Sequence, residues 1–191
     1  YKYIPLLITE MEEKKLESYV QKLQKYEDIS DRMEMEISAY LSKISQADLS
    51  SEGSSRVRSM LHIANYLERI GDIYLEVSRN LTNRKQQKAY FTPEMRKQVM
   101  QLSELVSRSL DIMVKNIEAD AESSQLEDAK KIERDVDQLF RRLKSDYIDK
   151  VEKGKFRIQS GMYYSDLLAE MERIADHASS VSKAVEQLDK N

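Results

Sequence analysis

Apolar residues recur at intervals of three and four along nearly the whole chain, and no stretch alternates as a half-buried strand would. This spacing is typical of amphipathic helices, so the pattern predicts an all-α protein. It lapses at 50–55, 84–92, 122–124 and between 154 and 161, which divides the chain into five predicted helices. The third has the clearest start, because Thr92, Pro93 and Glu94 are an N-cap residue, a first-turn proline and a first-turn acid.

Four of the predicted helices carry a distinct apolar stripe, which we expect to face a shared core. The stripes of the first two are Met33, Ile37, Tyr40, Leu41 and Ile44, then Ile63, Leu67, Ile70, Tyr74, Val77 and Leu81. Those of the last two are Ile132, Val136, Leu139, Phe140 and Leu143, then Leu167, Met171, Ile174, Ala178, Val181 and Val185. The pattern predicts an elongated bundle of five or six long antiparallel helices.

The chain contains an internal repeat. Glu68-Arg69-Ile70-Gly71-Asp72 returns, with one change, as Glu172-Arg173-Ile174-Ala175-Asp176. Before these copies, Met33-Glu34-x-x-Ile37 resembles Ile132-Glu133-x-x-Val136. The repeated unit is therefore a hairpin of two long helices. Gly71 and Ala175 are small residues at the same place in each copy, and we expect a neighbouring helix to approach closely there.

The repeat predicts two pseudo-equivalent halves, at 1–92 and 93–191. The second half has an additional helix in front of its hairpin, at about 94–121, and is predicted to be a three-helix bundle. Its counterpart in the first half either lies upstream of Tyr1 or is formed by residues 10–25, folded back on the rest. Because the chain opens on Tyr1 rather than Met, we expect it to be a piece of a longer protein.

Composition narrows the function classes. The chain has 34% charged residues, only 4 Gly and 2 Pro, and a net charge of −3, so it fits long helices and gives no electrostatic support for nucleic-acid binding. Its lack of cysteine excludes disulfides, thiolate zinc sites and cysteine catalysis. No apolar run approaches the ~18 residues that span a bilayer. No nucleophile–base pair or phosphate-binding glycine loop is present, so we expect no enzyme.

Each copy of the repeated phrase places two carboxylates four residues apart, on one face of a helix. Such a like-charge pair costs a helix roughly 0.2–0.5 kcal/mol, and a cost that occurs twice favours a cation as partner. Further acids form rows on the preceding helix of each hairpin. The candidate metal ligands are Glu27, Asp31, Glu34, Glu68 and Asp72 in the first half, and Glu133, Asp137, Glu172 and Asp176 in the second.

A plain solvated face is the alternative. Roughly six acidic pairs at this spacing arise by chance in such a composition, and Glu68 and Asp72 lie opposite their apolar stripe. An all-oxygen site would suit Mg²⁺, Ca²⁺, Mn²⁺ or oxo-bridged iron. A ferritin-like di-iron centre is excluded, because neither His62 nor His177 stands three residues after a Glu. His177 is better explained as a surface or hydrogen-bonded histidine than as a ligand.

These residues resemble the PhoU family of phosphate-uptake regulators, whose signature is a Glu/Asp-x-x-x-Asp motif in each of two three-helix bundles. The resemblance rests on Asn65–Asp72 and Glu172–Ala178 and covers about 26–186. Tyr26–Asp31 is most similar to the PhoU-like domain at the C-terminus of bacterial sodium/phosphate cotransporters. Ser38 stands where Asp137 stands in the second copy, and Ile73 where His177 stands, so the two sites need not bind with equal affinity.

The resemblance implies a cytoplasmic regulatory domain that binds a metal ion, with Fe, Mn, Mg and Zn as candidates, and that tunes phosphate transport. Its expected partners are the membrane portion of a transporter, in the same polypeptide and at the inner membrane, or phosphate-signalling proteins; a homodimer is a further option. The competing hypothesis is a metal-independent helical scaffold that binds a transporter or sensor protein.

Overall fold

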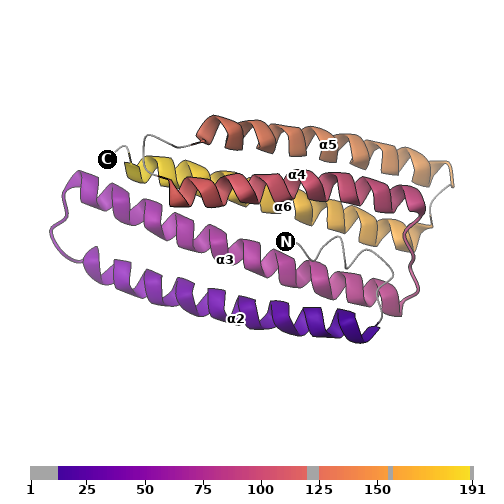
Figure 1. The fold of residues 1–191 in the computed structure, drawn as a ribbon, viewed down its shortest axis with the longest axis horizontal. Helices are drawn as coiled ribbons and strands as arrows, with labels where there is room; N and C mark the ends of the chain where they lie inside the picture. Colours follow the sequence, from indigo (N-terminus) through magenta and orange to yellow (C-terminus); the bar gives the residue numbers. More distant parts are fainter. Residues whose placement is uncertain (1–12, 120–124, 155–156, 190–191) are drawn as a thin grey trace.

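The computed structural model describes residues 13–119, 125–154 and 157–189, which form long helices and contain no strand. The helices are α2 (Glu13–Ile44), α3 (Ser51–Gln86), α4 (Pro93–Glu118), α5 (Leu126–Glu152) and α6 (Ile158–Asp189). Figure 1 shows them side by side along the long axis of the molecule. The predicted all-α class and elongated bundle are confirmed, whereas the predicted turn at 122–124 lies outside the described residues.

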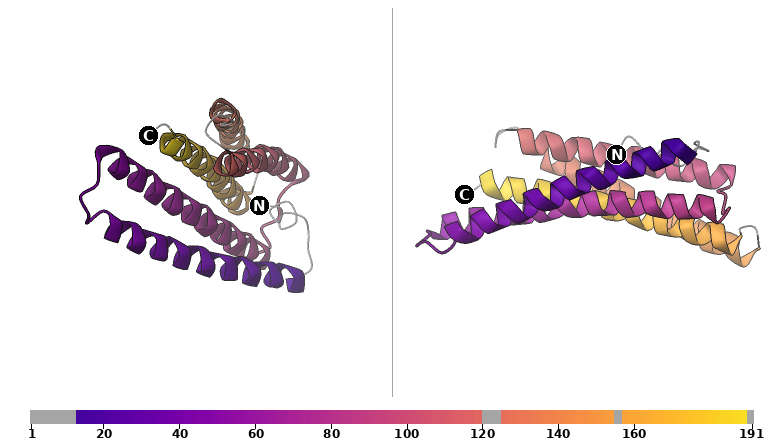
Figure 2. Two further views of the ribbon diagram at one scale, coloured as in Figure 1. Left: turned by 60° about the vertical axis from the view of Figure 1, so that its left-hand side comes forward. Right: turned by 90° about the horizontal axis from the view of Figure 1, so that it is seen from below.

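Two helices at the centre of the bundle join its halves. These are α3 and α6, the second helix of each hairpin, which pack along each other. α2 packs extensively only on α3, whereas α4 and α5 pack on α6 and on each other. The first half is thus a helix pair and the second a three-helix bundle, in the part of the chain that the structure describes. Figure 2 shows α2 at the outer edge, away from α4 and α5.

Local sequence signals place the helix starts. The Ser50 hydroxyl accepts a hydrogen bond from the Gly53 amide and caps α3, and the Thr92 hydroxyl accepts one from the Met95 amide and caps α4. The predicted start at Thr92 is confirmed. The predicted turn at 50–55 is wrong beyond its first residue, because the cap allows the helix to begin at Ser51.

Gly161 and Gly71 differ in how closely a neighbouring helix approaches them. The predicted break between 154 and 161 extends too far, because α6 begins at Ile158 and Gly161 lies within its first turn. A Cβ atom on Gly161 would lie 2.6 Å from the Tyr147 ring of α5, so any larger residue would force this ring to move. At Gly71 a Cβ atom would lie 3.6 Å from the Ser30 hydroxyl of α2, an ordinary contact, and its counterpart Ala175 is fully buried.

The core runs along α6, whose stripe is buried between the other helices. Tyr164, Met171, Ile174 and Val181 have no exposed surface, and the stripe of α3 packs against them. The Tyr164 hydroxyl donates a hydrogen bond to Gln98 of α4, which satisfies the one polar atom of this buried ring. No described helix is long and apolar enough to cross a membrane.

The predicted core stripe of α2 is wrong for most of its members. Met33 and Tyr40 are 56% and 66% exposed and Ile37 is also exposed, whereas Leu41 is buried. The reason is geometric: α2 packs on α3 with Leu41 buried and Ile44 half-buried, whereas Met33, Ile37 and Tyr40 lie on a side that no described helix covers.

Candidate carboxylate metal centre

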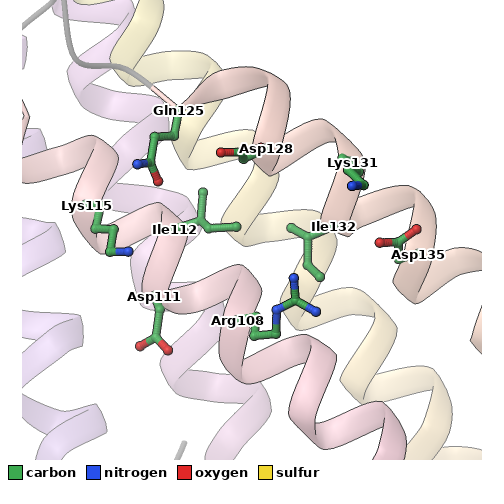
Figure 3. A pocket seen from close by; sticks show the side chains of 9 residues that line it. All are labelled: Arg108, Asp111, Ile112, Lys115, Gln125, Asp128, Lys131, Ile132 and Asp135. Carbon is green, nitrogen blue, oxygen red and sulfur yellow. The ribbon is translucent and has the colours of Figure 1, made fainter.

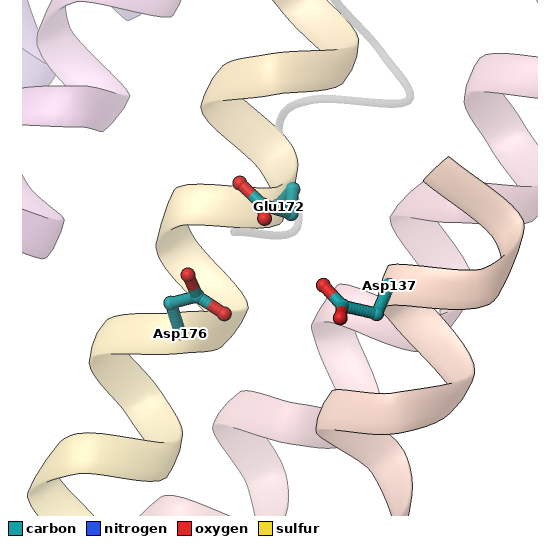
Figure 4. A group of neighbouring side chains, drawn as sticks. All are labelled: Asp137, Glu172 and Asp176. Atoms are coloured by element: carbon teal, nitrogen blue, oxygen red, sulfur yellow. The ribbon is translucent and has the colours of Figure 1, made fainter. Parts of the chain in front are cut away.

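Three predicted ligands of the second half come together between α5 and α6. One carboxylate oxygen from each of Asp137, Glu172 and Asp176 lies within 4.8 Å of the other two. Figure 4 shows Asp137 reaching from α5 toward the two carboxylates that α6 stacks one turn apart. All three are half-buried. We call these residues the α5–α6 triad.

Electrostatics show that the triad concentrates negative charge. Burial and the charges of Asp176 and Asp137 raise the pKa of Glu172, although Arg141 and Lys144 partly oppose this. Burial and the charges of Glu133 and Asp137 likewise raise the pKa of Asp176. A bound cation would stabilise the ionised carboxylates that the surroundings now disfavour.

Neighbouring groups already hold some of these acids. The Arg141 guanidinium donates to Asp137 at 2.8 Å, one turn along α5. Glu133 accepts hydrogen bonds from the Ser179 hydroxyl and from Lys183, whose Nζ lies 3.0 Å away. Glu133 is therefore beside the triad, where its charge acts on Asp176, and is not part of it. The repeat did not predict the roles of Arg141, which lies one turn after Asp137, or of Lys183, which lies two turns after Asp176.

The first half brings its acids together more loosely. Burial, the hydrogen bond with Asp72 and the charges of Asp72, Glu34 and Asp31 raise the pKa of Glu68 to about 7. Burial and the nearby charge of Asp72 also raise the pKa of Glu27. The acids of α2 thus face the pair on α3, and half-burial of Glu68 departs from the solvent-facing expectation.

The two halves differ at one decisive position. Ser38, the repeat counterpart of Asp137, donates a hydrogen bond to Glu34 at 2.8 Å instead of supplying a carboxylate. Among the described residues, only the α5–α6 triad meets the spacing of a three-ligand group. In the first half, Glu68 is instead hydrogen-bonded to Asp72.

The raised pKa of Glu68 predicts a measurable pH dependence. The folded chain binds more protons than the unfolded chain between the ordinary glutamate pKa of 4.5 and about 7, so stability falls as the pH rises through this window. Glu68→Gln removes this loss. In EDTA, the variant is expected to match the parent at pH 5 and to gain about 1 kcal/mol on it by pH 8, after discounting for screening by water. Urea titrations at both values measure this; an equal difference at both would contradict it.

Arg173 and His177, in and beside the second copy of the repeated phrase, make contacts away from the triad. Arg173 donates to Glu170, three residues earlier on α6, rather than to the triad. The His177 ring lies 5.4 Å from that of Tyr66 across the α3–α6 contact. Burial, then Arg69 and Arg173, lower the pKa of His177, which favours its neutral form. His177 is outside the triad.

A second polar cleft lies between α4 and α5, with a volume of about 440 Å³. Figure 3 shows charged side chains of both signs around it. Its lining comprises Arg108, Asp111, Ile112, Lys115, Gln125, Asp128, Lys131, Ile132 and Asp135. Three basic and three acidic side chains balance one another, so the cleft has no net preference for an anion or a cation.

The fold and the site define a class: an all-helical bundle built from two related halves, each with acidic side chains between its paired helices. The family model described as PhoU domain matches residues 7–81 and again 99–185. The chain therefore belongs to the PhoU family. Neither the comparison with curated proteins nor the comparison with solved structures gives a match.

Family membership gives the function in broad terms. PhoU proteins form a regulatory helical family with a role related to phosphate transport. PhoU domains interact with phosphate-signalling proteins and are typically cytoplasmic. The predicted relationship to this family is confirmed, while the boundary between the halves at 92 and 93 stays a prediction.

Proposed function

We propose that this chain is a cytoplasmic regulatory domain of a sodium/phosphate cotransporter, attached to the inner-membrane portion in the same polypeptide. In this proposal a metal ion held by the α5–α6 triad controls how the domain contacts the membrane portion or phosphate-signalling proteins. The observation that carries the metal is the triad itself, three carboxylates whose oxygens lie within 4.8 Å of one another.

The donor set fits a hard cation. Carboxylate oxygens are the ligands preferred by Mg²⁺ and Mn²⁺, and they also suit ferric iron. Burial, and after it the charges of neighbouring carboxylates, raise the pKa values of Glu172 and Asp176. Asp137, Glu172 and Asp176 would hold the ion, which would supply positive charge between α5 and α6. Glu133 would act from beside the site, through its charge and its contact with Ser179.

Such a site would link metal occupancy to the packing of the second half. Asp137 belongs to α5 and the other two ligands to α6, so a cation would oppose their mutual repulsion across the helix contact. Glu68 and Asp72, with Glu27, Asp31 and Glu34, form the weaker counterpart between α2 and α3. The first-half site lacks the carboxylate that Asp137 supplies in the second half, because Ser38 stands in its place. This difference supports unequal metal affinity of the two sites.

Phosphate uptake tests this proposal. Glu172→Gln with Asp176→Asn keeps shape and helix but removes two charges of the triad, so uptake by cells that carry the variant in the intact transporter is expected to change severalfold in its response to phosphate supply. Asp149→Asn with Glu152→Gln, exposed acids at the far end of α5, is the matched control and should leave uptake unchanged. Unchanged uptake in the triad variant would contradict the proposed role.

The second candidate is a metal-independent scaffold for a transporter or sensor protein. The observation that favours it is that Arg141 and Lys183 already pair with Asp137 and Glu133. Metal analysis of the purified chain separates the two. If the purified chain contains metal and the triad variant does not, the metal-dependent domain is supported. If the purified chain contains no metal, yet its deletion from the transporter still changes phosphate uptake, the scaffold is supported.

A further inference from the structure

A cavity opens at the end of the bundle where α3 is linked to α4 and where α6 begins. Figure 1 shows these two segments at the same end of the molecule. The cavity has a volume of about 340 Å³, and its polar lining is Lys88, Thr92, Arg157 and Ser160. We call it the end cavity. It lies about 18 Å along α6 from the triad, because Glu172 follows Ser160 by 12 residues.

The charged side chains that line the end cavity are both basic. Lys88 and Arg157 form no side-chain hydrogen bond or ion pair with another described residue. Glu94, the acid nearest to the lining along the chain, is paired with Lys150 of α5. The cleft between α4 and α5, in contrast, balances three basic against three acidic side chains. A cavity lined by one sign of charge favours a ligand of the other, so this one favours an anion.

Ser160 is a buried polar residue on the wall of the end cavity. It is 5% exposed, and its hydroxyl makes no hydrogen bond to another described residue. Buried hydroxyls in proteins are nearly always hydrogen-bonded, because an unsatisfied one has lost its water without a replacement. A ligand in the end cavity would supply the missing partner.

The starts of two helices add further donors. In α6 the Gly161 amide is bonded to the Arg157 carbonyl at 3.0 Å, and the helical amides before it have no partner inside the helix. Arg157 has no side-chain oxygen that could cap them. In α4 the Thr92 hydroxyl accepts from the Met95 amide, which leaves its own proton for a ligand. Free amides and the helix dipole both favour an anion at the start of α6.

The segment 88–92 is fixed before any ligand arrives. Lys88 has a left-handed backbone conformation, with φ 52°, where α3 ends and the chain turns toward α4. Arg84 lies 4.3 Å from the centre of the Phe91 ring and donates to the Ala89 carbonyl at 3.3 Å. Arg96 donates to the Phe91 carbonyl at 3.0 Å. A segment that is already ordered loses less entropy when a ligand binds.

The rest of the wall is apolar and leaves room for more than a bare ion. Phe91 and Met95 are buried, whereas Tyr90 is 58% exposed. A volume of about 340 Å³ is at the lower end of the range for small-molecule sites. A phosphate group carries nearly two negative charges and three acceptor oxygens, which suits two cations and several donors. A carboxylate has a single charge and would leave one cation without a partner.

We propose that the end cavity binds a phosphate group. Lys88 and Arg157 pair with its charge, and the hydroxyls of Thr92 and Ser160 and the first amides of α6 donate to its oxygens. The source is free phosphate or a small organic phosphate whose apolar part lies against Tyr90. Binding here depends neither on the triad nor on metal.

Isothermal titration calorimetry of the whole chain tests the proposal, with inorganic phosphate and phenyl phosphate as probes. EDTA removes metal ions that would themselves bind phosphate, and low salt leaves the charges unscreened. At least one probe is expected to bind with a dissociation constant of about 1 mM or lower. Inorganic phosphate of equal or higher affinity identifies free phosphate as the source. Phenyl phosphate that binds at least about tenfold more tightly identifies an organic phosphate.

Three variants locate the bound group. Lys88→Gln with Arg157→Gln is expected to raise the dissociation constant of the tighter probe about 100-fold, roughly tenfold for each charge-assisted bond that is lost. Ser160→Ala removes one neutral donor and should raise it about fivefold. Arg108→Gln with Lys131→Gln is the matched control, because it removes the same two charges from the cleft between α4 and α5 and should leave the affinity unchanged. Circular dichroism checks that each variant is folded.

Three results would overturn the proposal. Saturable binding of neither probe up to about 10 mM would show that the end cavity is not a phosphate site. Full affinity in the variant that lacks Lys88 and Arg157 would place the bound anion elsewhere on the chain. An equal loss of affinity in the control that lacks Arg108 and Lys131 would show that net charge alone attracts the anion.

Discussion

Millimolar Mn²⁺ is expected to raise the melting temperature of the metal-free chain by about 5–10 °C. A ligand at 100 times its dissociation constant stabilises the folded state by about 2.7 kcal/mol, and a chain of this size gains about 2–4 °C per kcal/mol. The cause is the α5–α6 triad, whose carboxylates repel one another until a cation joins them. Thermal melts with Mn²⁺, Mg²⁺ and Fe³⁺ measure the shift, which should shrink at pH 5 because protons compete for Glu172 and Asp176.

The repeat supplies the control for this experiment. Glu172→Gln with Asp176→Asn should abolish most of the shift and leave the metal-free melting temperature equal or slightly higher, because it relieves repulsion. Glu68→Gln with Asp72→Asn makes the same change in the first half, where Ser38 replaces the third carboxylate, and should retain most of the shift. Equal shifts of the melting temperature in both variants and the parent would contradict the metal site and favour the alternative, a solvated acidic face.

Met171→Ala is expected to reduce the free energy of unfolding by about 3 kcal/mol, which lowers the melting temperature by roughly 10 °C. Met171 is fully buried in the core along α6, so truncation leaves a cavity that the surrounding helices cannot close completely. Urea and thermal unfolding at low protein concentration measure the loss.

Leu67→Ala is the matched control for the core prediction. Leu67 holds the same repeat position on α3 but is only half-buried and lines an open apolar groove between α2 and α3. Its truncation is expected to cost about 1 kcal/mol, since water already reaches part of the side chain. Equal losses of unfolding free energy at the two positions would mean that the face of α3 around Leu67 is covered to the same degree as the face of α6 around Met171.

The acidic site could be predicted only in part. Spacing along one helix pairs Glu172 with Asp176, and the repeat points to the acids of the preceding helix. The sequence does not show which of Asp137 and Glu133 joins the pair on α6, since these two acids lie one turn apart on the same face of α5. The axial offset between α5 and α6 decides this, and that offset depends on packing across the helix contact, including the approach at Gly161.

The sequence by itself determined the helical class, the repeat and its register, because each depends on the order of apolar and polar residues along one chain. It also determined that the α2 stripe is apolar. Only the tertiary structure decided that Met33 and Tyr40 face outward, because burial depends on whether another helix lies opposite. In the second half α4 covers the equivalent face; in the first half no described helix does, so the same pattern gives a core in one place and an open groove in the other.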